Sequence, residues 1–278
     1  MNTLTEPFHY AFLQRALLEI VLVGIVSGAV GPLIVLRRLA FTGESIAETV
    51  LPGVVLAEAA GASLLGGAAA FALATVALIA AIERDRRVVN DVAVGIALSG
   101  LFPLGVILLA LQTTPTRSLQ DYLFGDLLSI APSDLVITAA IAITVAAVVT
   151  TRRRLLIAAS FDRPFAEALG FRAGRADVLV LTLIAASVLV CLLAVGTVLA
   201  VALLVIPAAT ARLLTQRLVP MALVAGVIAI SCGIAALELS YHAGLAASPA
   251  VVLLLAGAFL LAAMLTAARR AQLRSATA

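Results

Sequence analysis

The chain of 278 residues has no lysine, two histidines and two cysteines. Without lysine, the phosphate-binding loop Gly-x-x-x-x-Gly-Lys-Ser/Thr cannot form, so the chain cannot power itself with ATP by that route. It also lacks the His-Glu-x-x-His, Cys-x-x-Cys and Gly-x-Ser-x-Gly patterns of zinc peptidases, redox centres and serine hydrolases. Cys191 and Cys232 fall in separate apolar runs, which favours small core residues over a disulfide or a metal site. We therefore predict that the chain is not an enzyme and holds no permanent cofactor.

Charge is scarce as well: 12% of the residues are charged and 63% are hydrophobic, against about 25% charged in soluble domains. A soluble protein of this length could not bury so much apolar surface, so its solvent must be lipid. Nine apolar runs approach the ~20 residues that a helix needs to cross hydrocarbon, and none alternates with the period of a β-barrel strand. The runs are 16–36, 44–60, 63–82, 92–111, 134–150, 177–196, 197–215, 219–238 and 248–267.

These runs predict an all-α polytopic membrane bundle of eight or nine transmembrane helices, folded as one domain over residues 1–278. Runs 44–60 and 197–215 are the weak points, because either one can be re-entrant. Arginine supplies every positive side chain. When the arginines at 152–154 are placed inside, 16 arginines fall inside and two fall outside, which is a strong positive-inside bias. The bias predicts a cytoplasmic C-terminus and explains the net charge of +3 without nucleic acid as a partner.

Two acids in the run 44–60 are the best candidates for a transport site. Glu44 and Glu48 lie one turn apart, about 40° from each other around a helix. A carboxylate in hydrocarbon costs several kcal/mol unless it meets a partner, a cavity or an ion. Pro52 cannot donate a backbone hydrogen bond to the carbonyl of Glu48, so a local break that frees this carbonyl is expected. Helix capping by Glu44 at the cytoplasmic face is the alternative, whereas Glu58 and Glu19 are expected to be surface or snorkelling groups.

Two loops are expected to carry short helices outside the lipid. In the outer loop 112–133, residues 119–128 indicate an interfacial helix that serves as a lid or as a docking surface. In the cytoplasmic loop 151–176, Asp162 suits a helix cap, Pro164 a first turn and Gly170 a stop. The apolar face of this second helix suits insertion into the groove of a partner, with an ordinary interfacial helix as the alternative.

Several segments in fixed order, which together cover nearly the whole chain, resemble the membrane permease subunit of bacterial ABC transporters for zinc, manganese and iron. The segments are 31–41, 44–53, 122–126, 161–170, 194–199 and 204–212. The resemblance implies a homodimer in the bacterial plasma or inner membrane, two copies of a separate cytoplasmic ATPase and an extracytoplasmic metal-binding protein. ATP hydrolysis by the partner would drive alternating access and move a divalent metal ion into the cytoplasm.

The resemblance also implies the site residues. Glu44 and Glu48 would meet the metal in transit. The coupling helix, which inserts into the ATPase, would include Phe161, Asp162, Pro164, Phe165, Ala166, Ala168, Leu169 and Gly170.

The chain departs from the family at the two acids, where the family usually has aspartate for Glu44 and histidine for Glu48. An all-oxygen site favours Mn²⁺ or Fe²⁺ over Zn²⁺, and it leaves open a cargo other than a bare ion. Two alternatives therefore stay open. One is a permease for a metal chelate such as a siderophore or cobalamin, and the other is a secondary carrier or channel driven by an ion gradient.

Overall fold

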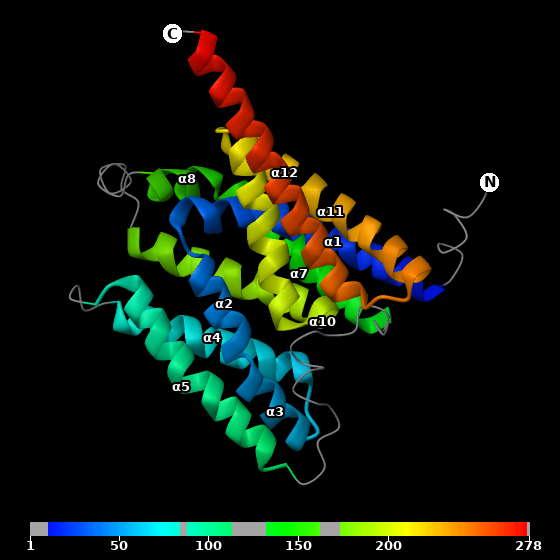
Figure 1. Ribbon diagram of the computed structural model, residues 1–278. Helices are drawn as coiled ribbons and strands as arrows, with labels where there is room; N and C mark the ends of the chain where they lie inside the picture. The colour runs from blue at the N-terminus through cyan, green and yellow to red at the C-terminus, as the bar shows by residue number, and fades with distance from the viewer. Residues whose placement is uncertain (1–10, 84–87, 113–131, 162–172, 277–278) are drawn as a thin grey trace.

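The computed structural model describes residues 11–83, 88–112, 132–161 and 173–276, and these ranges contain helices and no strand. This confirms the predicted all-α fold (Figure 1). The helices are α1 (Ala11–Arg37), α2 (Ala40–Thr49), α3 (Leu51–Ala59), α4 (Leu64–Ile82), α5 (Asn90–Ala110), α7 (Pro132–Thr151), α8 (Arg153–Phe161), α10 (Ala173–Leu214), α11 (Leu218–Ala243) and α12 (Ala247–Ala276).

Within the described ranges, seven helices are long and apolar enough to cross a membrane. The two remaining runs are those named above as weak points. Run 44–60 is divided into α2 and α3, and run 197–215 corresponds to the second part of α10, which follows a break at Gly196. Gly196 has φ 76°, a backbone conformation that favours glycine. The chain therefore turns sharply inside α10 rather than running straight.

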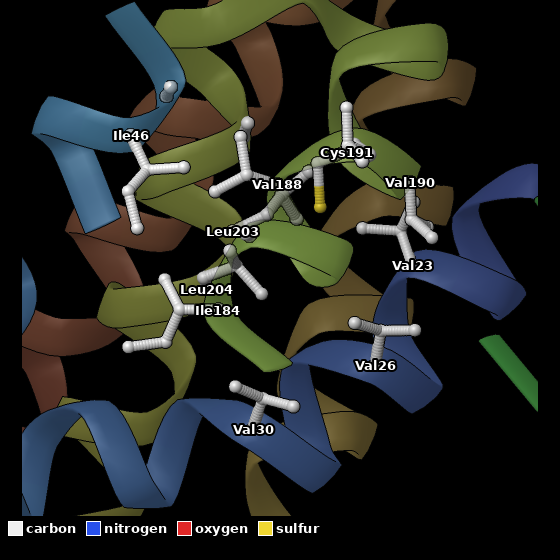
Figure 2. Close-up of a cluster of buried hydrophobic side chains, with 14 of the residues drawn as sticks. Val23, Val26, Val30, Ile46, Ile184, Val188, Val190, Cys191, Leu203 and Leu204 are labelled. Atoms are coloured by element: carbon white, nitrogen blue, oxygen red, sulfur yellow. The ribbon is translucent and has the colours of Figure 1, made fainter. Parts of the chain in front are cut away.

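The core is built around α1 and the first part of α10. In the most apolar 18-residue stretch of each of these two helices, 67% and 61% of the residues are buried, against 28% or less in the other five spanning helices. Figure 2 shows Val23, Val26 and Val30 of α1 facing aliphatic side chains of α10 such as Val190, Leu203 and Leu204. The outer helices leave large apolar side chains exposed, as expected for surfaces that meet lipid or a partner.

Small residues allow α1 and α11 to approach closely. A Cβ atom built on Gly28 would lie 2.7 Å from the carbonyl oxygen of Ala222, and one on Gly233 would lie 2.5 Å from the side chain of Ile20. The pairs Ile20–Gly233 and Gly28–Ala222 run in opposite directions, so the two helices are antiparallel. Backbone contact of this kind is a main source of helix association in lipid, where apolar burial gives little driving force. In Figure 1, α10 lies between this pair and the group α2 to α5.

Candidate functional site

Glu44 and Glu48 lie on the one open face of α2. Glu44 is exposed, Glu48 is half-buried, and Phe41 one turn earlier is 41% exposed. The other positions from Thr42 to Thr49 are buried. Spacings of three and four residues place Phe41 and the two acids on the same side of a helix. The structure therefore brings the two predicted site residues together on a polar strip of an otherwise covered helix.

Three neighbouring helices fix the covered side of α2. The Ser45 hydroxyl donates to the Val94 carbonyl of α5 at 3.4 Å. The Thr49 and Thr75 hydroxyls lie 2.9 Å apart and join α2 to α4. On the side of α10, a Cβ atom on Gly43 would meet Ile184 at 3.7 Å, which is ordinary van der Waals contact. Because these contacts lock the rotation of α2, the direction in which its open face points is fixed.

The predicted helix break next to the acids is present. α2 ends at Thr49, and α3 begins at Leu51 with Pro52 in its first turn. The Val50 N–H points toward the carbonyl of Glu48, but it lies only two residues away in the chain, so it does not replace the helical hydrogen bond that Pro52 cannot donate. The chain tightens at the junction, where the Gly53 N–H also donates to the Val50 carbonyl at 3.0 Å. The missing N–H of Pro52 therefore coincides with the break between α2 and α3.

Two glycine contacts hold this junction against α4 and α5. A Cβ atom on Gly67 of α4 would lie 2.1 Å from the carbonyl oxygen of Gly53. A Cβ atom on Gly105 of α5 would lie 2.9 Å from the backbone nitrogen of Pro52. Both obstacles are backbone atoms, which cannot rotate away as the end of a flexible side chain can. Close backbone packing of α4 and α5 against the start of α3 thus holds the junction that follows the two acids.

Gly67→Val is expected to destabilise the protein and to displace α3, because any side chain at this position meets the α3 backbone. Overpacking of this kind typically costs about 1–3 kcal/mol of folding stability. The matched control is Gly66→Val, since the nearest atom to a Cβ there is 3.6 Å away. Thermal unfolding in detergent should show a lower midpoint for Gly67→Val only. Equal midpoints for the two variants would contradict the close α3–α4 contact.

A third acid, Glu19 on α1, is buried, whereas the sequence predicted that it would reach the surface. Glu19 is 1% exposed, and neither of its carboxyl oxygens has a hydrogen-bond partner among the described residues. The Thr138 hydroxyl of α7, which is also buried, lies beside this carboxyl group. The prediction that Glu19 snorkels to the surface is therefore wrong, because α7 and α10 cover a position that the sequence places near a helix end.

No group of three or more His, Cys, Asp or Glu side chains gathers in the described part of the chain. Glu58 is half-buried on α3, across the break from Glu44 and Glu48. The carboxylate pair on α2 can supply two oxygen donor groups to a cation, and a complete coordination shell needs further ligands. The metal-binding role of Glu44 and Glu48 stays a prediction.

Both predicted loop helices lie outside the described residues. This applies to the interfacial helix at 119–128 and to the coupling residues from Asp162 to Gly170. Phe161, the remaining coupling residue, is the last residue of α8.

A polytopic helical bundle with an interrupted, acid-bearing second helix is typical of membrane transport proteins. Residues 9–266 match the model of the ABC 3 transport family, so the chain belongs to this family. The chain is 38% identical over 244 residues to the manganese transport system membrane protein MntC of Listeria monocytogenes, covering 88% of this chain and 87% of MntC. It is 35% identical over 256 residues to the manganese import system permease protein ScaB of Streptococcus parasanguinis, covering 92% and 90% of the two chains.

A solved structure, PsaBC from Streptococcus pneumoniae in complex with Fab, has the same fold. The TM-score is 0.83 with 31% sequence identity, and the match covers 94% of this chain and 94% of the other. The predicted resemblance to metal-transporting ABC permeases is confirmed by the family match and by these relatives.

Proposed function

We propose that this chain is the membrane-spanning subunit of an ATP-driven importer that moves a divalent transition metal ion, Mn²⁺ or Fe²⁺ before Zn²⁺, into the bacterial cytoplasm. Likeness over nearly the full length to manganese transport membrane proteins carries the proposal. The open face of α2 adds a physical reason, because its two carboxylates are hard oxygen donors of the kind that suits Mn²⁺. The chain itself does no covalent chemistry, and ATP is hydrolysed by a partner.

The carboxylate pair supports a homodimer. A single chain offers two carboxylates on α2, whereas hard divalent ions take about six oxygen ligands. A second copy that faces the same strip would raise the number of carboxylates to four, and water would complete the shell. Glu44, which is exposed in the single chain, would then lie at the path between the two copies. Two ATPase copies and an extracytoplasmic metal-binding protein complete the proposed assembly, with the C-terminus of this chain in the cytoplasm.

The spacing of the two acids supports a role for the pair in transport. Two carboxylates one helical turn apart repel each other when the site is empty, so a cation between them relieves the repulsion. A pair of monodentate ligands holds the ion less tightly than a closed cage does, which allows the ion to leave when the path opens to the other side. Rigid support of α2 by α4, α5 and α10 keeps the acids in position while the ion passes.

Co-purification of the affinity-tagged chain with its ABC ATPase tests the assembly. We expect a complex of two chains and two ATPase copies, measured by native mass spectrometry, with a Walker-A lysine variant of the ATPase as the control that assembles but does not hydrolyse ATP. A chain that purifies without an ATPase and accumulates metal on an ion gradient would support the secondary carrier instead. Uptake of a chelate without uptake of the bare ion would support the chelate permease.

A further inference from the structure

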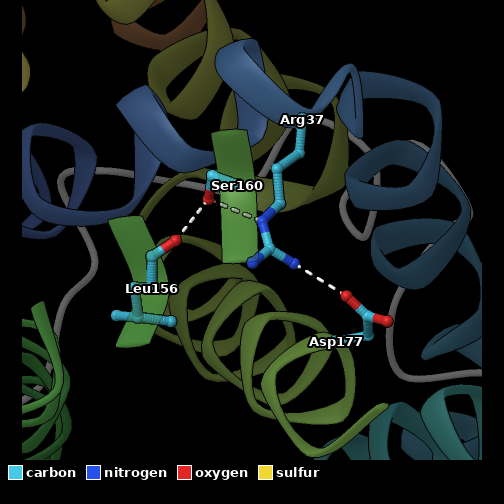
Figure 3. A network of polar contacts seen from close by, with 4 residues as sticks. All are labelled: Arg37, Leu156, Ser160 and Asp177. Carbon is cyan, nitrogen blue, oxygen red and sulfur yellow. Dashed lines mark hydrogen bonds and ion pairs between the residues drawn. The ribbon is translucent and has the colours of Figure 1, made fainter. Parts of the chain in front are cut away.

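One arginine joins three helices at a single end of the bundle. Arg37 is the last residue of α1, and its Nε donates to the Ser160 hydroxyl of α8 at 2.8 Å. Its Nη1 forms an ion pair with Oδ1 of Asp177 on α10 at 3.0 Å. Figure 3 shows the guanidinium between these two partners. The Arg37 side chain is only 9% exposed and Asp177 is 29% exposed, so solvent screens the pair only partly.

The backbone holds Arg37 in one position. Arg38 has φ 59°, and the Leu39 N–H donates back to the Ile34 carbonyl at 2.9 Å. This is the Schellman arrangement that ends a helix after Arg37. The Ser160 hydroxyl in turn donates to the Leu156 carbonyl one turn earlier in α8, which orients its oxygen toward the arginine. Both sides of the contact are therefore set before the side chains meet.

The partners of Arg37 have a particular place in the chain. α8 ends at Phe161 and α10 begins at Ala173, so Ser160 and Asp177 lie on the two helices that flank segment 162–172. On the other side, α1 passes through Arg38 and Leu39 directly into α2, which carries Glu44 and Glu48. Arg37 is thus a side chain that joins the helices around the predicted ATPase-contacting segment to the helix pair that holds the predicted metal site.

We propose that Arg37, with Ser160 and Asp177, is a positioning group that transmits ATPase-driven movement of α8 and α10 to α1 and α2. This inference rests on the proposed function. A guanidinium fork bonded to two helices at about 3 Å loses most of its attraction when either helix shifts alone, so the fork favours joint movement of all three. The Arg37 guanidinium is largely buried, so leaving it without its partner adds a further cost to separation.

The test compares ATP hydrolysed per metal ion accumulated, measured in proteoliposomes that contain the chain and its ATPase and take up Mn²⁺. Arg37→Gln is expected to keep ATP hydrolysis and to lower uptake, so that the ratio of ATP to Mn²⁺ rises about tenfold. Asp177→Asn breaks the same pair from the other side and should raise the ratio in the same direction. The matched control is Arg38→Gln, which removes the same charge from an exposed neighbour and should leave the ratio unchanged.

The ratio separates positioning from simple folding support. If Arg37→Gln lowers the thermal midpoint but leaves the ratio at the wild-type value, the proposal is overturned. If Arg37→Gln does not fold, Arg37→Lys serves instead, since it keeps the charge but cannot bond both partners as a fork. A raised ratio for Arg37→Lys supports the proposal, and an unchanged ratio overturns it. The wild-type complex is the reference: if it shows no ATP-dependent uptake of Mn²⁺, Fe²⁺ or Zn²⁺, the proposed function fails and this role falls with it, whatever the variants do.

Discussion

Replacing Glu48 with alanine is expected to lower metal uptake by about 100-fold, at least as much as the loss of an outer-shell partner costs a metal site. Glu48 is half-buried on the open face of α2, one turn deeper than Glu44. A cation that has lost part of its water needs a negative group at this depth, and a single remaining carboxylate gives it little compensation. The measurement is Mn²⁺ uptake in proteoliposomes with the ATPase present.

Two further variants make this result specific. Glu48→Gln keeps the size of the side chain and removes its charge, so it should lose nearly as much uptake as the alanine variant. Glu238→Gln removes an acid of similar half-buried exposure from α11 and should leave uptake within about twofold, since α11 is not one of the three helices that fix α2. Wild-type uptake by Glu48→Ala, with normal folding, would remove Glu48 from the transport path.

Replacing Glu48 with histidine is expected to shift the preferred metal from Mn²⁺ toward Zn²⁺ by about tenfold. Imidazole nitrogen suits Zn²⁺, whereas carboxylate oxygen suits Mn²⁺. The substitution also restores the residue that the resemblance to the family gives at this position. The measurement is the ratio of Zn²⁺ to Mn²⁺ accumulated in competition, which cancels differences in the amount of active protein.

Glu44→Asp is the matched control for the histidine variant. It makes the other family change on the same face of α2, but it keeps an oxygen donor, so the Zn²⁺ to Mn²⁺ ratio should stay at the wild-type value. If Glu48→His also leaves the ratio unchanged, Glu48 does not select the metal, and the extracytoplasmic binding protein becomes the better candidate for selection.

The sequence was most informative where a single residue type restricts the backbone. Pro52 predicts a break next to Glu48 because proline has no N–H to donate, and the structure separates α2 from α3 there. The length of the apolar runs predicts the membrane helices, and seven of the nine runs correspond to helices long enough to span. These features depend on local chemistry and on composition, which the sequence contains directly.

The features that the sequence did not predict depend on what a segment packs against. The position of Glu19 near a helix end predicts a surface group, yet α7 and α10 bury it. From the sequence, Arg37 is only one of many predicted cytoplasmic arginines. Its partners Ser160 and Asp177 lie more than 100 residues away in the chain, and the fold brings them into contact with it.

The central claim is that this chain imports a divalent metal ion at the expense of ATP hydrolysed by a partner. It is tested most directly by loading proteoliposomes that contain the chain and its ATPase with ATP or with a non-hydrolysable analogue, and measuring the uptake of Mn²⁺, Fe²⁺ and Zn²⁺. The binding protein is supplied on the opposite face. The account predicts accumulation against the gradient with ATP only, with Mn²⁺ or Fe²⁺ ahead of Zn²⁺. Equal accumulation with the analogue, or accumulation driven by an ion gradient alone, would contradict it.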